Sequence, residues 1–338
     1  MGRFLKIAVC AASVFIMTGC NHFGHFSGLT AANKSQTISS WLVYWDVETG
    51  EHDMRQLGSR LTSLSYFAAY FDHNDRLFIP DELITKQKQL PRNTTAKYLT
   101  FVNDRQNADK SVLNKNTNIL RRLLNDSESM VRHIDDVITL TLASGYDGIE
   151  IDYEKIWKDE TLSQSFLVFV KQLYEKAQKY QLKVRIVLEP SAPFAAGSFI
   201  KGPEYVVMFY NLHGLHNRPG PKANKQFIKS LLNKMKTLPG YKTVAFAAGG
   251  CQWGENGTAK LLTEVEARTL AAVNGAEAVR DEDSQCVVFS YHEAGVFYQV
   301  WYADVQTLHH WITAAREEGA TSIALWRLGG NVSLSQLN

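Results

Sequence analysis

Short runs rich in β-branched and aromatic residues recur along the chain and alternate with stretches whose apolar residues follow helical spacing. The runs predict eight strands, which cover Trp41–Asp46, Leu61–Tyr70, Lys97–Val102, Gly148–Asp152, Lys183–Leu188, Tyr205–Tyr210, Lys242–Phe246 and Ser322–Trp326. Strands that alternate with helices form a parallel sheet, which makes this an α/β protein. Eight such strands in one domain of this length favour a closed (β/α)8 barrel, or TIM barrel, over an open doubly wound sheet.

Four apolar stripes predict helices that cover the barrel. They consist of Met130, Ile134, Val137 and Thr141, then Leu162, Phe166, Phe169 and Leu173, then Phe227, Leu231, Met235 and Leu238, and finally Val305, Leu308, Ile312 and Ala315. We expect Asn125 to cap the first of these helices with Glu128 as its capping-box partner, and Gly145 to end it. The stripes are interpreted as core-facing surfaces without a function of their own.

The interval between the seventh and eighth strands is long and has a β pattern of its own. Cys286–Tyr291 and Val296–Tyr302 alternate around His292-Glu293-Ala294-Gly295, which predicts a β-hairpin. We therefore expect a small inserted subdomain at about residues 250–303, beside the active face of the barrel. Cys251 and Cys286 form either a disulfide or two separate buried thiols, and the sequence leaves both possibilities open.

The N-terminal segment has the pattern of an export signal. Arg3 and Lys6 precede the apolar run Ile7–Met17, which has the length of a signal peptide and is too short to cross a bilayer. The run ends in Met17-Thr18-Gly19-Cys20, which resembles the lipoprotein box of bacteria, in which the cysteine is lipidated and becomes the new N-terminus. An ordinary secretory signal with a chance cysteine is the alternative.

The lipoprotein resemblance implies that the chain has three parts. Residues 1–19 would be a signal peptide, residues 20–37 a tether, and residues 38–338 the folded barrel. Lipid on Cys20 would anchor the protein to a membrane of the cell envelope. Asn21 differs from the Asp that resembles an inner-membrane retention signal, so we expect the outer membrane in a cell that has two.

Composition excludes several classes of protein. The chain is 45% hydrophobic and 21% charged, so it is neither disordered nor of low complexity. It has 36 Lys and Arg against 34 Asp and Glu, and loss of Arg3 and Lys6 with the signal peptide leaves it neutral. We therefore expect no basic surface for nucleic acid.

One predicted strand carries an unusual row of acids. Residues 147–154 read Asp-Gly-Ile-Glu-Ile-Asp-Tyr-Glu, and because strand side chains alternate, Glu150, Asp152 and Glu154 share one face. Three carboxylates inside a barrel repel one another, so at least one pKa should be raised, as a general acid near neutral pH requires. Glu154 comes last, at the carboxyl end of the strand, where barrel active sites lie. A solvated edge strand with outward-facing acids is the alternative.

The row of acids resembles the Asp-x-x-Asp-x-Asp-x-Glu signature of family 18 glycoside hydrolases, with Glu150 where the family more often has Asp. Met208-Phe209-Tyr210-Asn211 resembles the Met-x-Tyr-Asp of the family's sixth strand, with Asn211 in place of Asp. Trp326 is similar to the eighth-strand Trp that forms the floor of the sugar pocket. The resemblance extends over most of residues 38–332 and is strongest to the branch of spore-cortex and peptidoglycan-associated N-acetylglucosaminidases.

The family resemblance implies a retaining, substrate-assisted mechanism with no cofactor and no metal. Glu154 would protonate the leaving oxygen, and the substrate's own 2-acetamido oxygen would attack the anomeric carbon. Asp152 would orient the acetamido N–H, and Tyr210 would hydrogen-bond the acetamido oxygen. Asp147 and Glu150 would hold Asp152 and share its proton, with Asn211 in a supporting position. The substrate would be a β-1,4-linked glycan that contains N-acetylglucosamine, either peptidoglycan or a chitin-like chain.

The candidate substrate-binding residues stand at the carboxyl ends of predicted strands. They are Trp326, Trp45, Tyr44, Asn103, Glu189 and Met208. His213 and His216 have the spacing of a helical metal pair, but they lie among Gly and Asn residues after a strand, which favours loop histidines over metal ligands.

Two other functions stay open. A catalytically silent lectin on the same barrel would lose the terminal acid, but Glu154 is present. A two-carboxylate glycosidase would use Glu154 as the acid and Glu189 or Glu255 as the nucleophile. A retaining enzyme of that kind needs the two carboxyl groups roughly 5–5.5 Å apart.

Overall fold

The computed structural model describes residues 38–87, 95–109, 111–196 and 199–337. The expected signal peptide, the tether and Cys20 lie outside the described residues. None of the helices formed within those ranges combines the length and the apolarity that crossing a bilayer requires.

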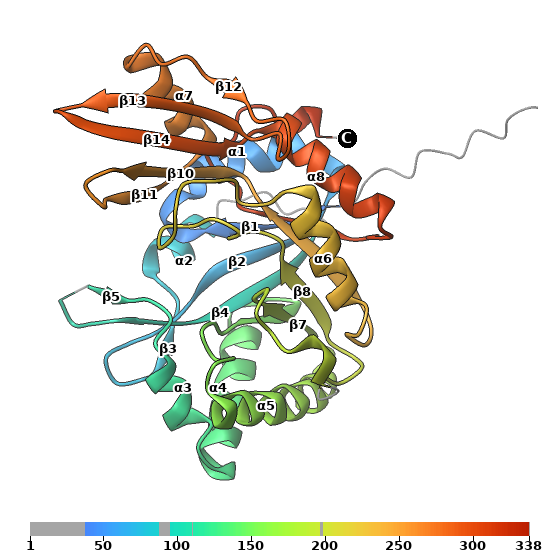
Figure 1. Ribbon diagram of the computed structural model, residues 1–338. Helices are drawn as coiled ribbons and strands as arrows, with labels where there is room; N and C mark the ends of the chain where they lie inside the picture. The colour runs from blue at the N-terminus through green and yellow to red at the C-terminus, as the bar shows by residue number, and fades with distance from the viewer. Residues whose placement is uncertain (1–37, 88–94, 110, 197–198, 338) are drawn as a thin grey trace, which may run out of the picture. The chain divides into compact units, whose positions relative to one another are not determined.

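Eight parallel strands close into a barrel, as the sequence predicted (Figure 1). They are β1 (Ile38–Val43), β2 (Leu61–Phe71), β4 (Ala96–Gln106), β6 (Gly148–Asp152), β7 (Lys183–Leu188), β8 (Glu204–Met208), β9 (Lys242–Ala247) and β15 (Ile323–Trp326). Closure occurs at β1, which pairs in parallel with β2 on one side and with β15 on the other. The (β/α)8 fold is therefore confirmed.

The first strand is displaced from the predicted range. β1 begins at Ile38, and Tyr44–Asp46, predicted as its end, form the 3-10 turn η1. Ser39 and Ser40 lie in β1 and donate side-chain hydrogen bonds to the carbonyl oxygens of Ile323 and Leu325. Small hydroxyl side chains satisfied in this way fit a buried strand, although a hydrophobic pattern does not detect them.

Helices pack around the outside of the barrel (Figure 1). They are α1 (Val47–Leu57), α2 (Asp81–Gln87), α3 (Thr117–Leu123), α4 (Ser127–Ala143), α5 (Glu160–Gln178), α6 (Lys225–Met235) and α8 (Val305–Glu317). The four predicted stripes fall on α4, α5, α6 and α8 or within three residues of their ends. Between β7 and β8, the described residues form only the 3-10 turn η3 (Phe194–Ala196).

The predicted cap of α4 is wrong by one residue. Asp126, not Asn125, is the N-cap, and its carboxylate accepts the main-chain N–H groups of Glu128 and Ser129. Ser129 rather than Glu128 is the capping-box partner. A carboxylate at this position also interacts favourably with the helix dipole.

The insertion between β9 and α8 is a five-stranded antiparallel sheet with one helix. It contains β10 (Gly249–Gly254), β11 (Ala259–Leu262), α7 (Glu264–Val273), β12 (Val279–Arg280), β13 (Val287–Glu293) and β14 (Val296–Ala303). The predicted hairpin is β13–β14, and its turn residues Ala294 and Gly295 have φ angles of 50° and 78°. Gly250 is required in β10 because a Cβ there would collide with the carbonyl oxygen of Trp301. The remaining strands and α7 were not predicted.

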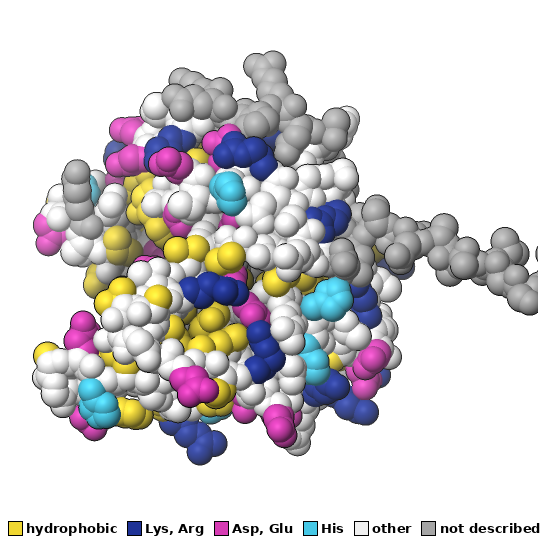
Figure 2. Space-filling model, turned by 90° about the horizontal axis from the view of Figure 1, so that it is seen from above, with side chains coloured by type: hydrophobic (Ala, Val, Ile, Leu, Met, Phe, Trp, Pro, Cys, Tyr) yellow, Lys and Arg dark blue, Asp and Glu magenta, His cyan; other side chains and the backbone are white. Residues whose placement is uncertain are grey.

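Short strands extend the main sheet beside the barrel. β3 (Leu77–Phe78) pairs with the end of β2, and β5 (Val112–Leu113) pairs with the end of β4. On the face drawn in Figure 2, basic and acidic side chains of the described residues are interspersed rather than gathered by sign. This distribution agrees with the near-zero net charge.

Candidate active site

The centre of the barrel holds Glu150, which is completely buried. Its carboxylate accepts hydrogen bonds from Trp41 Nε1 at 2.5 Å, Thr100 Oγ1 at 2.7 Å and Ser65 Oγ at 2.8 Å. These donors come from three other barrel strands, β1, β4 and β2. Burial raises the pKa of Glu150, and the nearby Arg185 charge and the three hydrogen bonds oppose that rise.

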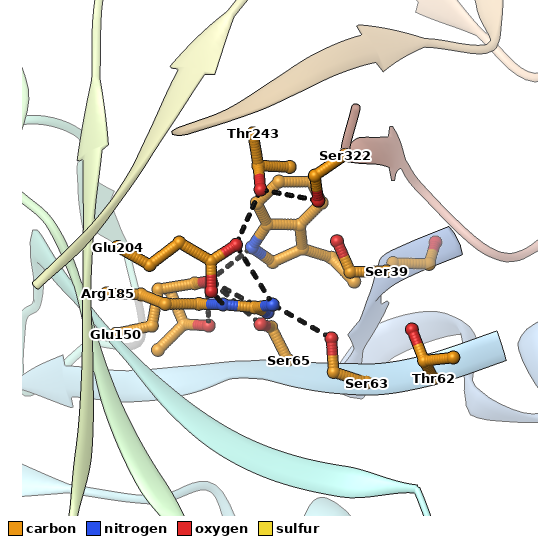
Figure 3. Close-up of polar contacts among 12 residues, drawn as sticks. Ser39, Thr62, Ser63, Ser65, Glu150, Arg185, Glu204, Thr243 and Ser322 are labelled. Atoms are coloured by element: carbon orange, nitrogen blue, oxygen red, sulfur yellow. Dashed lines mark hydrogen bonds and ion pairs between the residues drawn. The ribbon is translucent and has the colours of Figure 1, made fainter. Parts of the chain in front are cut away.

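Arg185 connects Glu150 to the amino ends of the strands (Figure 3). Its Nη1 atom lies 3.9 Å from Glu150 Oε2, and its Nε donates to Glu204 Oε2 at 2.7 Å. Thr243 Oγ1 donates to the other oxygen of Glu204 at 2.5 Å. The cationic Arg185 thus lies between two carboxylates, which offsets its burial.

Asp152 is the next inward residue of β6 and is only 6% exposed. Its Oδ1 atom is buried and has no hydrogen-bond partner among the described residues. Burial and the charge of Glu154 raise the pKa of Asp152 well above its ordinary value, and the Lys115 charge opposes them. Asp152 therefore holds a proton more readily than an ordinary aspartate.

Glu154 lies just beyond β6, and Asn103 fixes its backbone. The Glu154 N–H donates to Asn103 Oδ1 at 3.0 Å, and Asn103 Nδ2 donates to the Glu154 carbonyl at 3.1 Å. The Glu154 side chain is 14% exposed and forms an ion pair with Lys115. Asn103 thus holds the Glu154 backbone in place through two hydrogen bonds, whereas the sequence suggested that it binds the substrate.

Two more carboxylates lie within the electrostatic reach of Glu154. Glu189 Oε2 accepts the N–H of Lys155 at 2.8 Å, and Asp104 Oδ1 accepts the N–H of Lys115 at 2.7 Å. Burial raises the pKa of both groups, and the charge of Glu154 raises each further. The carboxyl end of the barrel is therefore strongly acidic.

Aromatic side chains complete this end of the barrel. Tyr210 and Met208 pack in one buried cluster with Trp41, and Trp326 packs against that cluster. Trp326 meets Phe67 edge-on at a centroid distance of 4.9 Å. Burial, together with the charges of Asp152 and Glu154, raises the pKa of Tyr210 well above its ordinary value, so its hydroxyl remains a hydrogen-bond donor.

The residues of η1 stand at the rim of the site. Trp45 is 52% exposed, and its ring lies 5.9 Å from the guanidinium carbon of Arg327. Tyr44 is half-buried and packs edge-on against Tyr70 at 5.6 Å. Asn211 follows Tyr210 with a φ of 69°, a conformation that Asn tolerates better than most residues, and its side chain is exposed.

The structure does not bring Asp147 to Asp152. Asp147 precedes the amino end of β6, is exposed, and accepts the main-chain N–H of Lys97 at 2.9 Å. A strand rises about 3.3 Å per residue, so five residues separate the two carboxylates by most of the barrel's depth. The implied role of Asp147 in holding Asp152 is therefore wrong, and Asp147 joins β6 to β4 instead.

Other candidates also lie away from the acids. Glu255 belongs to the β10–β11 turn of the inserted sheet, where its Oε1 accepts the N–H of Phe297 at 3.0 Å. Cys251 and Cys286 are buried free thiols. His213 Nδ1 hydrogen-bonds the carbonyl of Arg218 at 3.0 Å, and no cluster of metal-ligating side chains occurs within the described ranges.

A pocket of about 540 Å³ lies at the opposite, amino end of the strands. Arg185, Glu204 and Thr243 line it, whereas Asp152, Glu154 and Tyr210 do not. Because barrel chemistry occurs at the carboxyl ends of the strands, we assign the candidate site to the acids and not to this pocket.

Sequence analysis missed several residues that shape the site. They are Trp41, Ser65, Tyr70, Thr100, Lys115 and Arg185. Arg185 could most readily have been recognised, because its charge interrupts the apolar residues Val184–Leu188 of β7. Ser65 and Thr100 could not have been recognised from the sequence, since hydroxyl residues occur in strands for many reasons.

A closed barrel with acids at the carboxyl ends of its strands has the architecture of a barrel enzyme. The family model of the glycosyl hydrolases family 18 matches residues 40–331, which is most of the chain. The chain therefore belongs to glycosyl hydrolase family 18, and its general activity is glycoside hydrolysis.

Individual relatives agree with this assignment. An uncharacterized glycosylase of Bacillus subtilis (strain 168), YvbX, is 22% identical over 268 residues, which cover 72% of this chain and 77% of that protein. The spore cortex-lytic enzyme SleL of Bacillus cereus superposes with a TM-score of 0.74 at 18% identity, over 89% of this chain and 73% of SleL. A chitinase of Chromobacterium violaceum superposes with a TM-score of 0.70 at 14% identity, over 88% of this chain and 96% of the chitinase.

The burial of Asp152 leads to a stability prediction. Asp152→Asn should raise the free energy of unfolding at neutral pH, because it removes a buried charge that leaves one oxygen unpartnered. A carboxyl whose pKa is raised by folding destabilises the folded state as the pH rises above the pKa of the unfolded chain, about 3.9. The gain should therefore be absent below about pH 4 and present at pH 7, as urea unfolding followed by circular dichroism would measure.

Asp147→Asn is the matched control, because Asp147 is exposed and lies just before the same strand. It should show no such gain between the two pH values. A lower unfolding free energy for Asp152→Asn than for the wild type at pH 7 would contradict the interpretation of Asp152 as a costly buried charge.

Proposed function

We propose that the protein is a retaining N-acetylglucosaminidase that hydrolyses β-1,4-linked glycans, either peptidoglycan or chitin-like chains, with assistance from the substrate. The proposal rests mainly on Asp152, which is buried with a raised pKa and shares one electrostatic cluster with Glu154 and Tyr210. Membership of family 18 supports glycoside hydrolysis. One structural relative is named a spore cortex-lytic enzyme and another a chitinase, and these names suggest the two classes of glycan.

In the first step, Glu154 donates its proton to the glycosidic oxygen as the bond from that oxygen to the anomeric carbon breaks. The oxygen of the substrate's 2-acetamido group forms a new bond to the same carbon, which gives an oxazolinium ion. Asp152 orients the acetamido N–H, and its negative charge stabilises this cation. The Tyr210 hydroxyl, which keeps its proton because burial raises its pKa, donates a hydrogen bond to the acetamido oxygen.

In the second step, the Glu154 carboxylate takes a proton from water, and the oxygen of that water attacks the anomeric carbon. The oxazolinium ring opens, and the product keeps the anomeric configuration of the substrate. Family 18 differs in this respect from enzymes that use a second carboxylate as the nucleophile. Trp326 supplies an apolar surface beneath the reacting sugar, and the exposed Trp45 provides a second stacking surface at the rim.

We also propose that lipid on Cys20 holds the enzyme at the cell envelope. The apolar segment that ends in Thr18-Gly19-Cys20 supports this proposal. Cys20→Ala should move the protein from the membrane fraction to the soluble or the unprocessed fraction, as fractionation and N-terminal mass analysis would measure. A Cys20→Ala protein that is processed and still membrane-bound would contradict lipidation.

Glu154→Gln should abolish most of the activity. Glutamine keeps the shape and hydrogen bonding of the side chain but cannot donate a proton to the leaving group. The expected loss in kcat is at least the roughly 10²–10⁴-fold that general acid catalysis contributes. Release of reducing ends from chitin oligomers and from peptidoglycan measures the loss, with Glu255→Gln in the inserted sheet as the control.

A second substrate distinguishes the mechanisms. A glycoside with hydroxyl in place of the 2-acetamido group lacks the internal nucleophile, so the wild type should barely cleave it. Equal turnover of both glycosides would reject substrate assistance and favour Glu189 as an enzyme nucleophile. Binding of N-acetylated glycans without any turnover would favour the lectin.

Trp326→Ala should weaken binding of the sugar, because it removes the aromatic surface at the end of β15. By analogy with base stacking, the loss is on the order of 1–3 kcal/mol. Calorimetric titration with a chitin oligomer, in the Glu154→Gln background to prevent turnover, measures it. Tyr241→Ala is the control, since Tyr241 is exposed near the opposite end of the barrel, and unaltered affinity in a folded Trp326→Ala protein would refute the assignment.

A further inference from the structure

Lys115 is held beside the acids by a specific backbone arrangement. It follows β5 and has a φ of 56°, which is unusual for a residue other than glycine. Its N–H donates to Asp104 Oδ1 at 2.7 Å, and the N–H of Asn116 donates to the Asn103 carbonyl at 2.7 Å. Because the end of β4 fixes both this segment and the Glu154 backbone, the position of Lys115 relative to Glu154 is built into the fold.

The ammonium group of Lys115 pairs with Glu154 Oε2. Burial by itself would lower the pKa of Lys115, but the charge and hydrogen bond of Glu154, with the charges of Asp152 and Glu189, raise it above its ordinary value. The ammonium therefore remains charged. The other charged or titratable groups that face this pair are Asp104 from β4, Tyr210 after β8 and Lys155 in the turn after Glu154.

We propose that Lys115 is a positioning residue that orients the Glu154 carboxyl and controls its charge state during the reaction. The inference rests on the proposed role of Glu154 as the general acid. A general acid becomes negatively charged as it gives up its proton, and a fixed cation at hydrogen-bond distance stabilises that charge as it develops. Because the two groups are in direct contact, removing the cation should change the pH dependence of the reaction.

Lys115 also makes the acidic cluster possible. Asp104, Asp152, Glu154 and Glu189 come from three neighbouring strands or the turns that follow them, and the charge of Glu154 raises the pKa of each of the other three. Without a cation among them, repulsion would favour protons shared over the whole cluster. Direct contact with the Lys115 ammonium distinguishes Glu154 from the other three and assigns it one orientation.

The test compares Lys115→Met, Lys115→Arg and Lys155→Met by their pH profiles on a neutral chitin oligomer. Lys155→Met is the matched control, because Lys155 lies beside Glu154 and has a φ of 62°, but among the described residues its side chain forms no ion pair with Glu154. Lys115→Met should move the basic limb of kcat/KM to higher pH by about one unit or more, the effect of a lost opposite charge. Its maximal kcat should fall up to about 10²-fold, the cost of a misplaced group, with little change in KM.

Lys115→Arg should restore the basic limb toward that of the wild type, and Lys155→Met should leave it nearly in place. A folded Lys115→Met protein whose activity falls at every pH while the basic limb stays fixed would overturn the inference, because that result indicates a purely structural role.

A measurement without substrate separates this inference from the proposed function. The carboxyl carbon signal of Glu154, assigned by its loss in Glu154→Gln, should titrate at a higher pH in Lys115→Met than in the wild type. An unchanged titration overturns the charge coupling, even if the enzyme is active. A shifted titration in a protein that cleaves no glycan overturns the proposed function and with it the role of Lys115 in the reaction.

Discussion

The row of three carboxylates, Glu150 and Asp152 in β6 and Glu154 just beyond it, is the constraint on which the site depends. The first and last members each have a cation, since Arg185 lies 3.9 Å from Glu150 and Lys115 pairs with Glu154. The middle member, Asp152, has no direct cation and one unpartnered oxygen. The electrostatic cost of the row is thus concentrated on Asp152, as expected where a site is organised for chemistry rather than for stability.

Closure of the barrel brings together the groups that offset the cost of burying these carboxylates. The donors to Glu150 are 109, 85 and 50 residues away in sequence, on β1, β2 and β4. They meet only because β1 pairs with β15 as well as with β2, which turns the side chains of every strand toward one axis. Arg185 joins them from β7, which pairs with β6 on the side away from β4. The tertiary fold therefore determines whether β6 can hold buried carboxylates.

The features that depend on local periodicity could be predicted from the sequence. The contacts that form only when the barrel closes could not. The period of two along β6 identified the inward acids, and the spacing of apolar residues identified α4, α5, α6 and α8. The role of Asp147 was wrong because it came from a linear signature, whereas a residue before Gly148 lies at the opposite end of the strand from Asp152. Lys115 could not be predicted, since its position depends on a positive φ and on hydrogen bonds to the end of β4.

The surroundings of Glu150 restrict the path of the proton on Asp152. Trp41 Nε1 is only a donor, and it shares Oε1 with the Thr100 hydroxyl, while the Ser65 hydroxyl donates to Oε2. A proton on Glu150 would require the Ser65 or Thr100 hydroxyl to turn and accept it, or would occupy the second lone pair of Oε2, the oxygen nearest Arg185. Although burial raises the pKa of Glu150, its partners are therefore arranged for the carboxylate. Among the neighbouring charges, that of Glu154 influences the pKa of Asp152 most, so the charge of Glu154 affects how firmly Asp152 holds a proton.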